Sequence, residues 1–304
     1  MSKLTQLLCL AELDQSQLSA LLELALHIKQ SPETYQHALK GRSIALLFEK
    51  PSLRTRVSFD VGINKLGGHS VYLDQQNGAL GVRESVEDFG SNLACWTDAI
   101  VARVYSQKTL VQLALSSKKP VINALSDLYH PCQALADLLT LKEQFGDLSK
   151  VHLAFVGDGN NVCHSLMLGA AILGMDLTVV TPQGFGPDAH VLLKAQGLAE
   201  KSGANLRLSQ HLSSAAGADA LYTDTWLSMG TRADPALIEQ LFSPYQINTA
   251  VMQRLGVKHF MHCLPAHRGQ EVTSEVLDSS YSLVLQQAEN RMHAQNAVLV
   301  SLFS

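Results

Sequence analysis

Short apolar runs of strand length alternate with longer amphipathic segments from about residue 43 to residue 290. This alternation is typical of parallel sheets covered by helices. In the first half we predict strands at residues 43–49, 69–73, 99–104 and 120–123. In the second half we predict strands at residues 152–156, 177–181, 218–223 and 259–263.

A helix-like segment at residues 133–145, followed by a polar stretch at 146–150, separates the two sets of strands. The chain has 304 residues, 46% of them hydrophobic, which is enough to bury two cores. We therefore predict an α/β fold of two doubly wound parallel-sheet domains linked by interdomain helices. The first domain is expected at residues 1–146 and the second at 147–288, with a C-terminal helix at 289–304 packing back onto the first.

The formal net charge of −4 gives no global reason to expect binding to nucleic acid or to an anionic membrane. An anionic ligand must then be held by a local cluster of positive charge. The apolar N-terminal stretch carries acidic residues and is interpreted as one or two amphipathic helices, and no membrane span is expected. The five cysteines are scattered without a CxxC pair, which favours reduced thiols in a cytoplasmic protein.

Ligands of open parallel sheets bind beyond the carboxyl ends of the strands. One such loop contains Ser52, Arg54 and Thr55 before a helical pattern at residues 57–66, so that helix N–H groups and a guanidinium meet there, as a phosphate requires. A solvated basic turn with a Ser/Thr helix cap is an equally good reading of that loop. The required glycines of nucleotide-binding loops are missing here.

Two further loops contain candidate functional residues. Arg103 ends a very apolar strand, where a charge needs a ligand or a carboxylate partner, and a structural ion pair is the alternative. His130 and Gln133 flank Pro131 at the expected start of a helix and can hydrogen-bond a carbonyl or an amide. For an isolated His-Pro pair a structural role is the better reading.

The order and spacing of these motifs, Ser52-Leu53-Arg54-Thr55, Arg103 and His130-Pro131-Cys132-Gln133, resemble those of the aspartate/ornithine carbamoyltransferase family over roughly residues 40–300. Leu53 stands where that family most often has Thr, and Ala79 where relatives often carry a Gln that reaches a neighbouring subunit. The resemblance implies a carbamoyl phosphate site at the following residues: Ser52, Leu53, Arg54, Thr55, Arg103, His130, Gln133, Cys263, Leu264 and Arg291.

The second half contains the expected acceptor side. The sequence TDTWLSMG resembles the loop with which ornithine-specific members of the family close over ornithine, and it implies an ornithine site at Asn161, Asp224, Ser228 and Met229. Cys263 belongs to a His-Cys-Leu-Pro motif; by itself it would more often be a buried thiol. Because His262 and Cys263 are neighbours on an expected strand, we predict that they point to opposite faces and form no joint metal site.

The resemblance implies transfer of the carbamoyl group of carbamoyl phosphate to the side-chain amine of ornithine. The residues implied in catalysis are Arg54, Arg103, His130 and Cys263. Neither a metal nor a cofactor is expected, because carbamoyl phosphate already carries a good leaving group. A homotrimer, or a multiple of trimers, is implied as well.

Three other functions stay open at this point. One is carbamoyl transfer to another amine, such as putrescine or an acylated ornithine. Another is an inactive homologue that only binds, motivated by Leu53 and Ala79. The third is a nicotinamide-dependent dehydrogenase that uses the GDGNN turn at residues 157–161, although its glycine pattern is incomplete and Asp176 precedes its strand rather than ending it.

Overall fold

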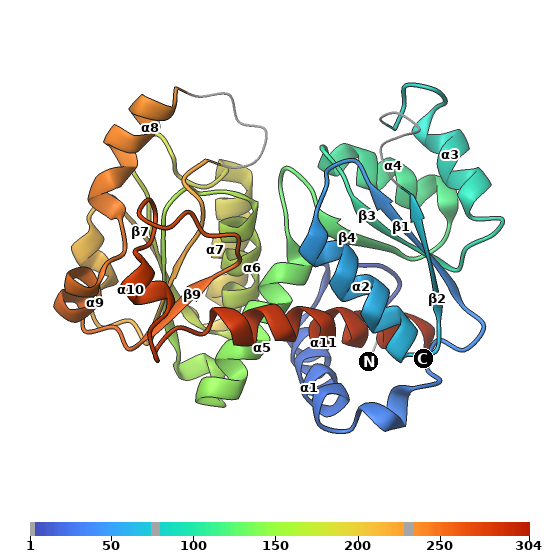
Figure 1. Cartoon of the computed structure of the whole chain (residues 1–304), viewed down its shortest axis with the longest axis horizontal. Helices are drawn as coiled ribbons and strands as arrows, with labels where there is room; N and C mark the ends of the chain where they lie inside the picture. Colours follow the sequence, from blue (N-terminus) through green and yellow to red (C-terminus); the bar gives the residue numbers. More distant parts are fainter. Residues whose placement is uncertain (1–3, 74–79, 228–233) are drawn as a thin grey trace. The chain divides into compact units, whose positions relative to one another are not determined.

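The computed structural model describes residues 4–73, 80–227 and 234–304 (Figure 1). The chain divides into two compact units: unit 1 comprises Met1–Leu139 together with Asn290–Ser304, and unit 2 comprises Thr140–Glu289. Each unit is built on one parallel sheet with helices on both faces, so the predicted fold class is confirmed.

Unit 1 contains a four-stranded parallel sheet in the order β2-β1-β3-β4. Its strands are β1 (Ser43–Phe48), β2 (His69–Leu73), β3 (Ala99–Arg103) and β4 (Val121–Leu125). Its helices are α1 (Gln15–Gln30), α2 (Leu53–Lys65), α3 (Val86–Leu93), α4 (Gln107–Ser117), the first turns of α5 (Pro131–Phe145) and, from Asn290 on, α11 (Val284–Phe303). β1 and β3 are adjacent although α2, β2 and α3 separate them in sequence, so the strand order reverses between them.

The core of unit 1 is aliphatic. Ala45, Ile100, Ala102 and Val121 are fully buried, and they come from three neighbouring strands. Such runs of apolar residues are expected where helices cover both faces of a parallel sheet. On one face α2 lies so close to α11 that a side chain at Gly62 would clash with Asn296. The N-terminal segment adds Leu7 beside β4, where its N–H donates to Val121 O at 2.9 Å.

Unit 2 contains a five-stranded parallel sheet in the order β7-β6-β5-β8-β9. Its strands are β5 (His152–Val156), β6 (Asp176–Val180), β7 (Leu206–Ser209), β8 (Ala220–Thr223) and β9 (His259–His262). Its helices, besides the rest of α5 and the start of α11, are α6 (Asn161–Leu173), α7 (Ala189–Ser202), α8 (Pro235–Phe242), α9 (Thr249–Leu255) and α10 (Ser274–Leu277). Here the strand order reverses between β5 and β8.

Short 3-10 helices complete the described chain, at Leu10–Glu12, Pro32–Tyr35, Leu148–Lys150, Leu212–Ala215 and Ser243–Tyr245. In the part of the chain that the structure describes, no helix is both long and apolar enough to cross a bilayer. In an open parallel sheet the crevice at the reversal point is where ligands bind. The loops after β1 and β3 in unit 1, and after β5 and β8 in unit 2, are therefore the places to search for a site.

Candidate functional site

A cluster of polar side chains lies at the reversal point of the unit 1 sheet. Phe48 of β1 pairs with Arg103 of β3, so the loops that follow both strands begin at the same edge. Ser52 caps α2: its backbone is extended and its Oγ accepts from Thr55 N at 3.4 Å. The helix therefore begins four residues earlier than the sequence pattern predicts. Arg54 lies in its first turn and is exposed to solvent.

A chain of hydrogen bonds joins this helix start to α5 and α11. Arg291 donates through one guanidinium nitrogen to Thr55 Oγ1 at 2.8 Å and through the other to Gln133 Oε1 at 2.9 Å. The Ser52 hydroxyl donates to Thr55 Oγ1 at 2.9 Å. The structure thus brings Ser52, Thr55, Gln133 and Arg291 together, and these are four of the residues that the family resemblance places at carbamoyl phosphate.

His130 and Arg103 belong to the same cluster. His130 directly precedes Pro131, the first residue of α5, and is almost fully buried. Burial holds the pKa of His130 well below 6.5, and the positive charges of Arg291 and Arg103 lower it further. His130 is therefore a neutral imidazole at neutral pH, and it can donate one hydrogen bond to an oxygen. Arg103 itself is only 3% exposed.

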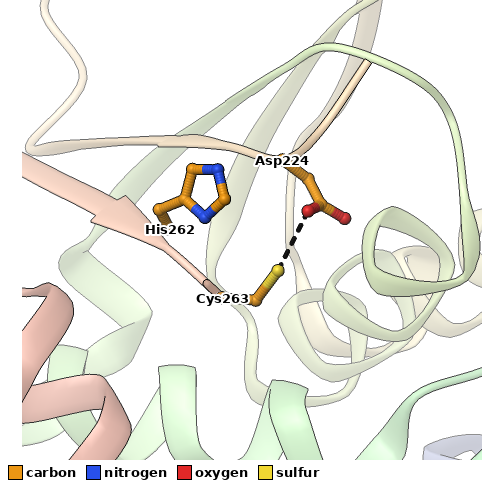
Figure 2. A group of neighbouring side chains, drawn as sticks. All are labelled: Asp224, His262 and Cys263. Carbon is orange, nitrogen blue, oxygen red and sulfur yellow. Dashed lines mark hydrogen bonds between the residues drawn. The ribbon is translucent and has the colours of Figure 1, made fainter. Parts of the chain in front are cut away.

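In unit 2, Asp224 follows β8 at the reversal point of the sheet, and its carboxylate is held by three donors. Oδ1 accepts from Thr225 N at 2.8 Å and from the Cys263 thiol at 3.0 Å. Oδ2 accepts from Asn160 Nδ2 at 2.7 Å. Figure 2 shows the thiol of Cys263 directed at the Asp224 carboxylate, close to the imidazole of His262. Asp224 and Cys263 were both predicted, and they are in contact.

Asn160 is a site residue that the sequence reasoning missed. It caps α6 by accepting from Val162 N and Cys163 N, while its amide nitrogen holds Asp224. The predicted residue, Asn161, is half-buried and is the first residue of α6. A pair of asparagines before a helix signals an N-cap, but the rule that the cap directly precedes the first apolar residue selects Asn161, so this signal alone does not find Asn160.

His262 and Glu271 form a fully buried pair beside Cys263 that was also missed. His262 Nδ1 accepts from Leu264 N at 2.9 Å, so the ring proton resides on Nε2 and faces Glu271 Oε1 at 3.1 Å. The same carboxylate oxygen accepts from His267 N at 2.6 Å. Leu264, another predicted residue, has a φ of 57° and is held by its bond to the imidazole. The pair thus orients the backbone that carries Cys263 and Leu264.

The prediction that His262 and Cys263 point apart is wrong. β9 ends at His262, so strand alternation does not extend to Cys263. One ligand atom from each of Asp224, His262 and Cys263 lies within 4.8 Å of the other two, which is a spacing that a metal ion accepts. Both nitrogens of His262 are already hydrogen-bonded, however, so a cation here would have to displace Leu264 N or Glu271.

Cys263 differs chemically from the buried cysteines. Burial raises the pKa of Cys132 to about 12 and that of Cys163 well above its ordinary value of 9.0. Both are therefore unreactive thiols at neutral pH. Cys263 is half-buried and hydrogen-bonded to a carboxylate. Ser228, Met229 and Ala79, which the sequence analysis singled out, lie outside the described residues.

The comparisons with known proteins agree across the whole chain. The family profile described as "Aspartate/ornithine carbamoyltransferase, carbamoyl-P binding domain" matches residues 5–143, and the one described as "Aspartate/ornithine carbamoyltransferase, Asp/Orn binding domain" matches residues 149–302. An ornithine carbamoyltransferase of Shewanella oneidensis is 62% identical over 297 residues, covering 98% of this chain and 99% of the relative. One of a Vibrio species is 55% identical and covers 97% of this chain and 98% of the relative.

Solved structures agree with the sequence matches. The ornithine carbamoyltransferase of Pyrococcus furiosus superimposes with a TM-score of 0.94 at 43% identity, covering 98% of this chain and 97% of that one. The enzyme of Gloeobacter violaceus superimposes with a TM-score of 0.90 at 42% identity and covers both chains completely. With both domain profiles matched and full-length relatives this similar, the chain belongs to the aspartate/ornithine carbamoyltransferase family.

Proposed function

We propose that the chain is an ornithine carbamoyltransferase, which transfers the carbamoyl group of carbamoyl phosphate to the side-chain amine of L-ornithine and releases L-citrulline and phosphate. The observation that best supports this function is the 62% identity to an ornithine carbamoyltransferase over 98% of the chain. Unit 1 binds carbamoyl phosphate and unit 2 binds ornithine, in line with the descriptions of the two matching profiles.

The phosphate of the first substrate is held at the start of α2. Backbone N–H groups of the first turn and the helix dipole favour an anion there. Arg54, Arg103 and Arg291 supply three guanidinium groups, whose planar donor pairs fit phosphate oxygens. Ser52 and Thr55 add hydroxyls, and Leu53 contributes its N–H only. These groups also neutralise the phosphate as it departs.

The carbonyl of carbamoyl phosphate needs donors that are strongest once its oxygen becomes negative. Thr55, Arg103 and His130 fill this role, and Gln133 binds the carbamoyl group through its amide. His130 suits the role because it is neutral, so it donates one N–H without adding a third charge beside two buried guanidinium groups. Removing a single donor of this kind commonly costs about 10²–10³ in rate.

Ornithine is held in unit 2 by Asp224, Asn161, Ser228 and Met229, with Cys263 and Leu264 near the reacting groups. An alkylammonium has a pKa of about 10.4, so the site must select or produce the free amine. The amine nitrogen attacks the carbonyl carbon, the bond from that carbon to the phosphate oxygen breaks, and the proton released by the nitrogen is taken up by the departing phosphate. The contact of the Cys263 thiol with Asp224 supports a role for this pair near the amine.

We also propose a homotrimer in the cytoplasm. A stripe of exposed apolar side chains runs along α2 at one-turn spacing, with Leu53 76%, Val57 49% and Val61 41% exposed. An apolar stripe of this kind is typical of a surface that another protein covers, and a second copy of this chain is the proposed occupant. All five cysteines are free thiols, which suits a reducing compartment.

The function is tested by measuring which amine the purified protein carbamoylates. With carbamoyl phosphate present, we expect citrulline from ornithine, and turnover of putrescine, acetylornithine and aspartate that is lower by at least about 10²-fold in kcat/KM. Faster turnover of another amine would assign a different acceptor. Tight binding of a bisubstrate phosphonate without citrulline formation would identify an inactive homologue instead.

A further inference from the structure

A fully buried carboxylate lies behind the polar cluster of unit 1. Asp137 is on α5, one turn after Gln133, so the two side chains lie on the same face of the helix. Asp137 Oδ1 accepts from Gln133 Nε2 at 2.8 Å. A carboxylate that is removed from water is costly unless hydrogen bonds and positive charge compensate it. Neither the motif matches nor the comparisons assign Asp137 a function.

The contact with Asp137 decides which way the amide of Gln133 faces. Because Asp137 Oδ1 accepts from Gln133 Nε2, the NH₂ end of the amide faces the carboxyl group. The oxygen end is then directed at Arg291, which only donates, and that contact measures 2.9 Å. If the amide turned over, its NH₂ group would face a guanidinium nitrogen and both hydrogen bonds would be lost.

The orientation of the Gln133 amide also fixes side chains at the proposed phosphate site. Arg291, fixed by Gln133 through one nitrogen, donates through the other to Thr55 Oγ1 at 2.8 Å. Thr55 Oγ1 also accepts from the Ser52 hydroxyl, so both of its lone pairs are used and its own hydrogen is left to donate to another acceptor. Thr55, Gln133 and Arg291 are all buried, where such networks are stronger than in water.

We propose that Asp137 is a positioning residue for carbamoyl phosphate: it fixes the amide of Gln133 and, through it, the guanidinium of Arg291 and the hydroxyl of Thr55. The inference rests on the proposed function, because it assigns the cluster to that substrate. Asp137 acts through its neighbours and does not touch the ligand itself.

The test compares three substitutions in the full-length protein. Asp137→Asn keeps an oxygen that accepts from Gln133, whereas Asp137→Leu has similar bulk and no acceptor. Asp137→Ala removes the acceptor without inserting a large apolar group, so the comparison survives if the leucine variant fails to fold. Because both variants lose the hydrogen bond that holds Gln133, we expect the KM for carbamoyl phosphate to rise at least about tenfold in Asp137→Leu and Asp137→Ala.

In Asp137→Asn we expect the same KM to stay within about threefold of the wild type, since the hydrogen bond is retained. The KM for ornithine should be unchanged in all three variants. Asn123→Leu is the matched control: Asn123 is also fully buried in unit 1, on β4, where its amide donates to Leu8 O at 2.9 Å. Its loss should lower the melting temperature and leave the KM for carbamoyl phosphate unchanged.

The inference is overturned if Asp137→Asn raises the KM as much as Asp137→Leu, or if Asn123→Leu raises it equally, because loss of packing would then explain the effect. It is also overturned if Asp137→Ala keeps the wild-type KM for carbamoyl phosphate. A wild-type protein that forms no citrulline at all would instead reject the proposed function. The two failures are therefore distinguishable.

Discussion

Two buried guanidinium groups act on His130 in unit 1. Arg103 and Arg291 are 3% and 5% exposed, and both disfavour a third positive charge on His130. The site therefore contains fixed positive charge together with a neutral donor. This combination suits a ligand that has an anionic phosphate at one end and a neutral carbonyl at the other.

The neutral state of His130 predicts a loss of stability in acid. Because the pKa of His130 is lower in the folded protein than its ordinary value of 6.5, the unfolded chain binds more protons below pH 6.5. The unfolding free energy contributed by this group is fully present above pH 6.5 and falls as the pH falls below it. In melting curves at pH 5–8, His130→Asn should lose less stability toward pH 5 than the wild type does. Parallel pH profiles would contradict the assignment.

We expect Asn160 to affect the binding of ornithine, because its amide donates to the Asp224 carboxylate. Asn160→Ala removes both the cap of α6 and a hydrogen bond to a carboxylate, so we expect the KM for ornithine to rise about tenfold and that for carbamoyl phosphate to stay unchanged. Asp188→Ala provides the control, since Asp188 caps α7 in the same way through His190 N and Val191 N. Equal ornithine KM values in the two variants would reject the role of Asn160.

At the residue scale, the sequence predicted those members of the site that stand in local motifs. Thr55, Gln133 and Arg291 were placed in one site by resemblance, and the structure joins them by hydrogen bonds. Their role in binding stays a prediction. Asn160, Asp137 and Glu271 were missed because their significance depends on the fold. Asn160 lies 64 residues from Asp224 in the chain, and Gln133 lies 158 residues from Arg291, so spacing along the chain does not reveal these contacts.

At the scale of elements, the bounds of every strand that was predicted agree with the structure to within two residues. β2 and β5 have the predicted bounds, whereas β9 ends one residue earlier. β7 was missed: it has four residues, none of them fully buried, and forms the edge of its sheet, so it needs no apolar run. α2 begins before its apolar pattern does, because the Ser52 cap rather than hydrophobic periodicity sets its start.

The cap of α2 provides a test at this scale. Ser52→Ala should cost about 1 kcal/mol in unfolding free energy, the usual value for a lost N-cap. It should also raise the KM for carbamoyl phosphate, because the cap fixes the N–H groups proposed to hold the phosphate. Ser85 caps α3 in the same way, by accepting from Asp88 N at 3.0 Å. Ser85→Ala should lose similar stability and keep its KM; a normal KM in both variants would refute the phosphate assignment.

At the scale of the whole molecule, the sequence predicted two α/β domains because two sets of strands flank one polar break. It also predicted that helices link the domains, but not at which residue α5 and α11 pass from one unit to the other, since a helix pattern does not reveal where one core ends and another begins. The α2 stripe likewise becomes visible only once exposure is known for Leu53, Val57 and Val61.

The apolar stripe on α2 predicts that lysines introduced there will disrupt the trimer. By light scattering, we expect a mass near three times the 33.0 kDa of one chain, and Val57→Lys combined with Val61→Lys should shift it toward that of a single chain. Leu115→Lys, which changes a side chain 73% exposed on α4, should leave the mass unchanged. A wild-type mass near one chain would contradict the trimer.

The central claim, that unit 1 holds carbamoyl phosphate and unit 2 holds ornithine, is tested most directly by steady-state kinetics of Arg54→Ala and Asp224→Ala measured side by side. Arg54→Ala should lower kcat/KM for carbamoyl phosphate by at least about 10²-fold. Asp224→Ala should raise the KM for ornithine strongly and change that for carbamoyl phosphate little. Near-normal turnover by Arg54→Ala, or a loss of carbamoyl phosphate affinity in Asp224→Ala, would contradict the account.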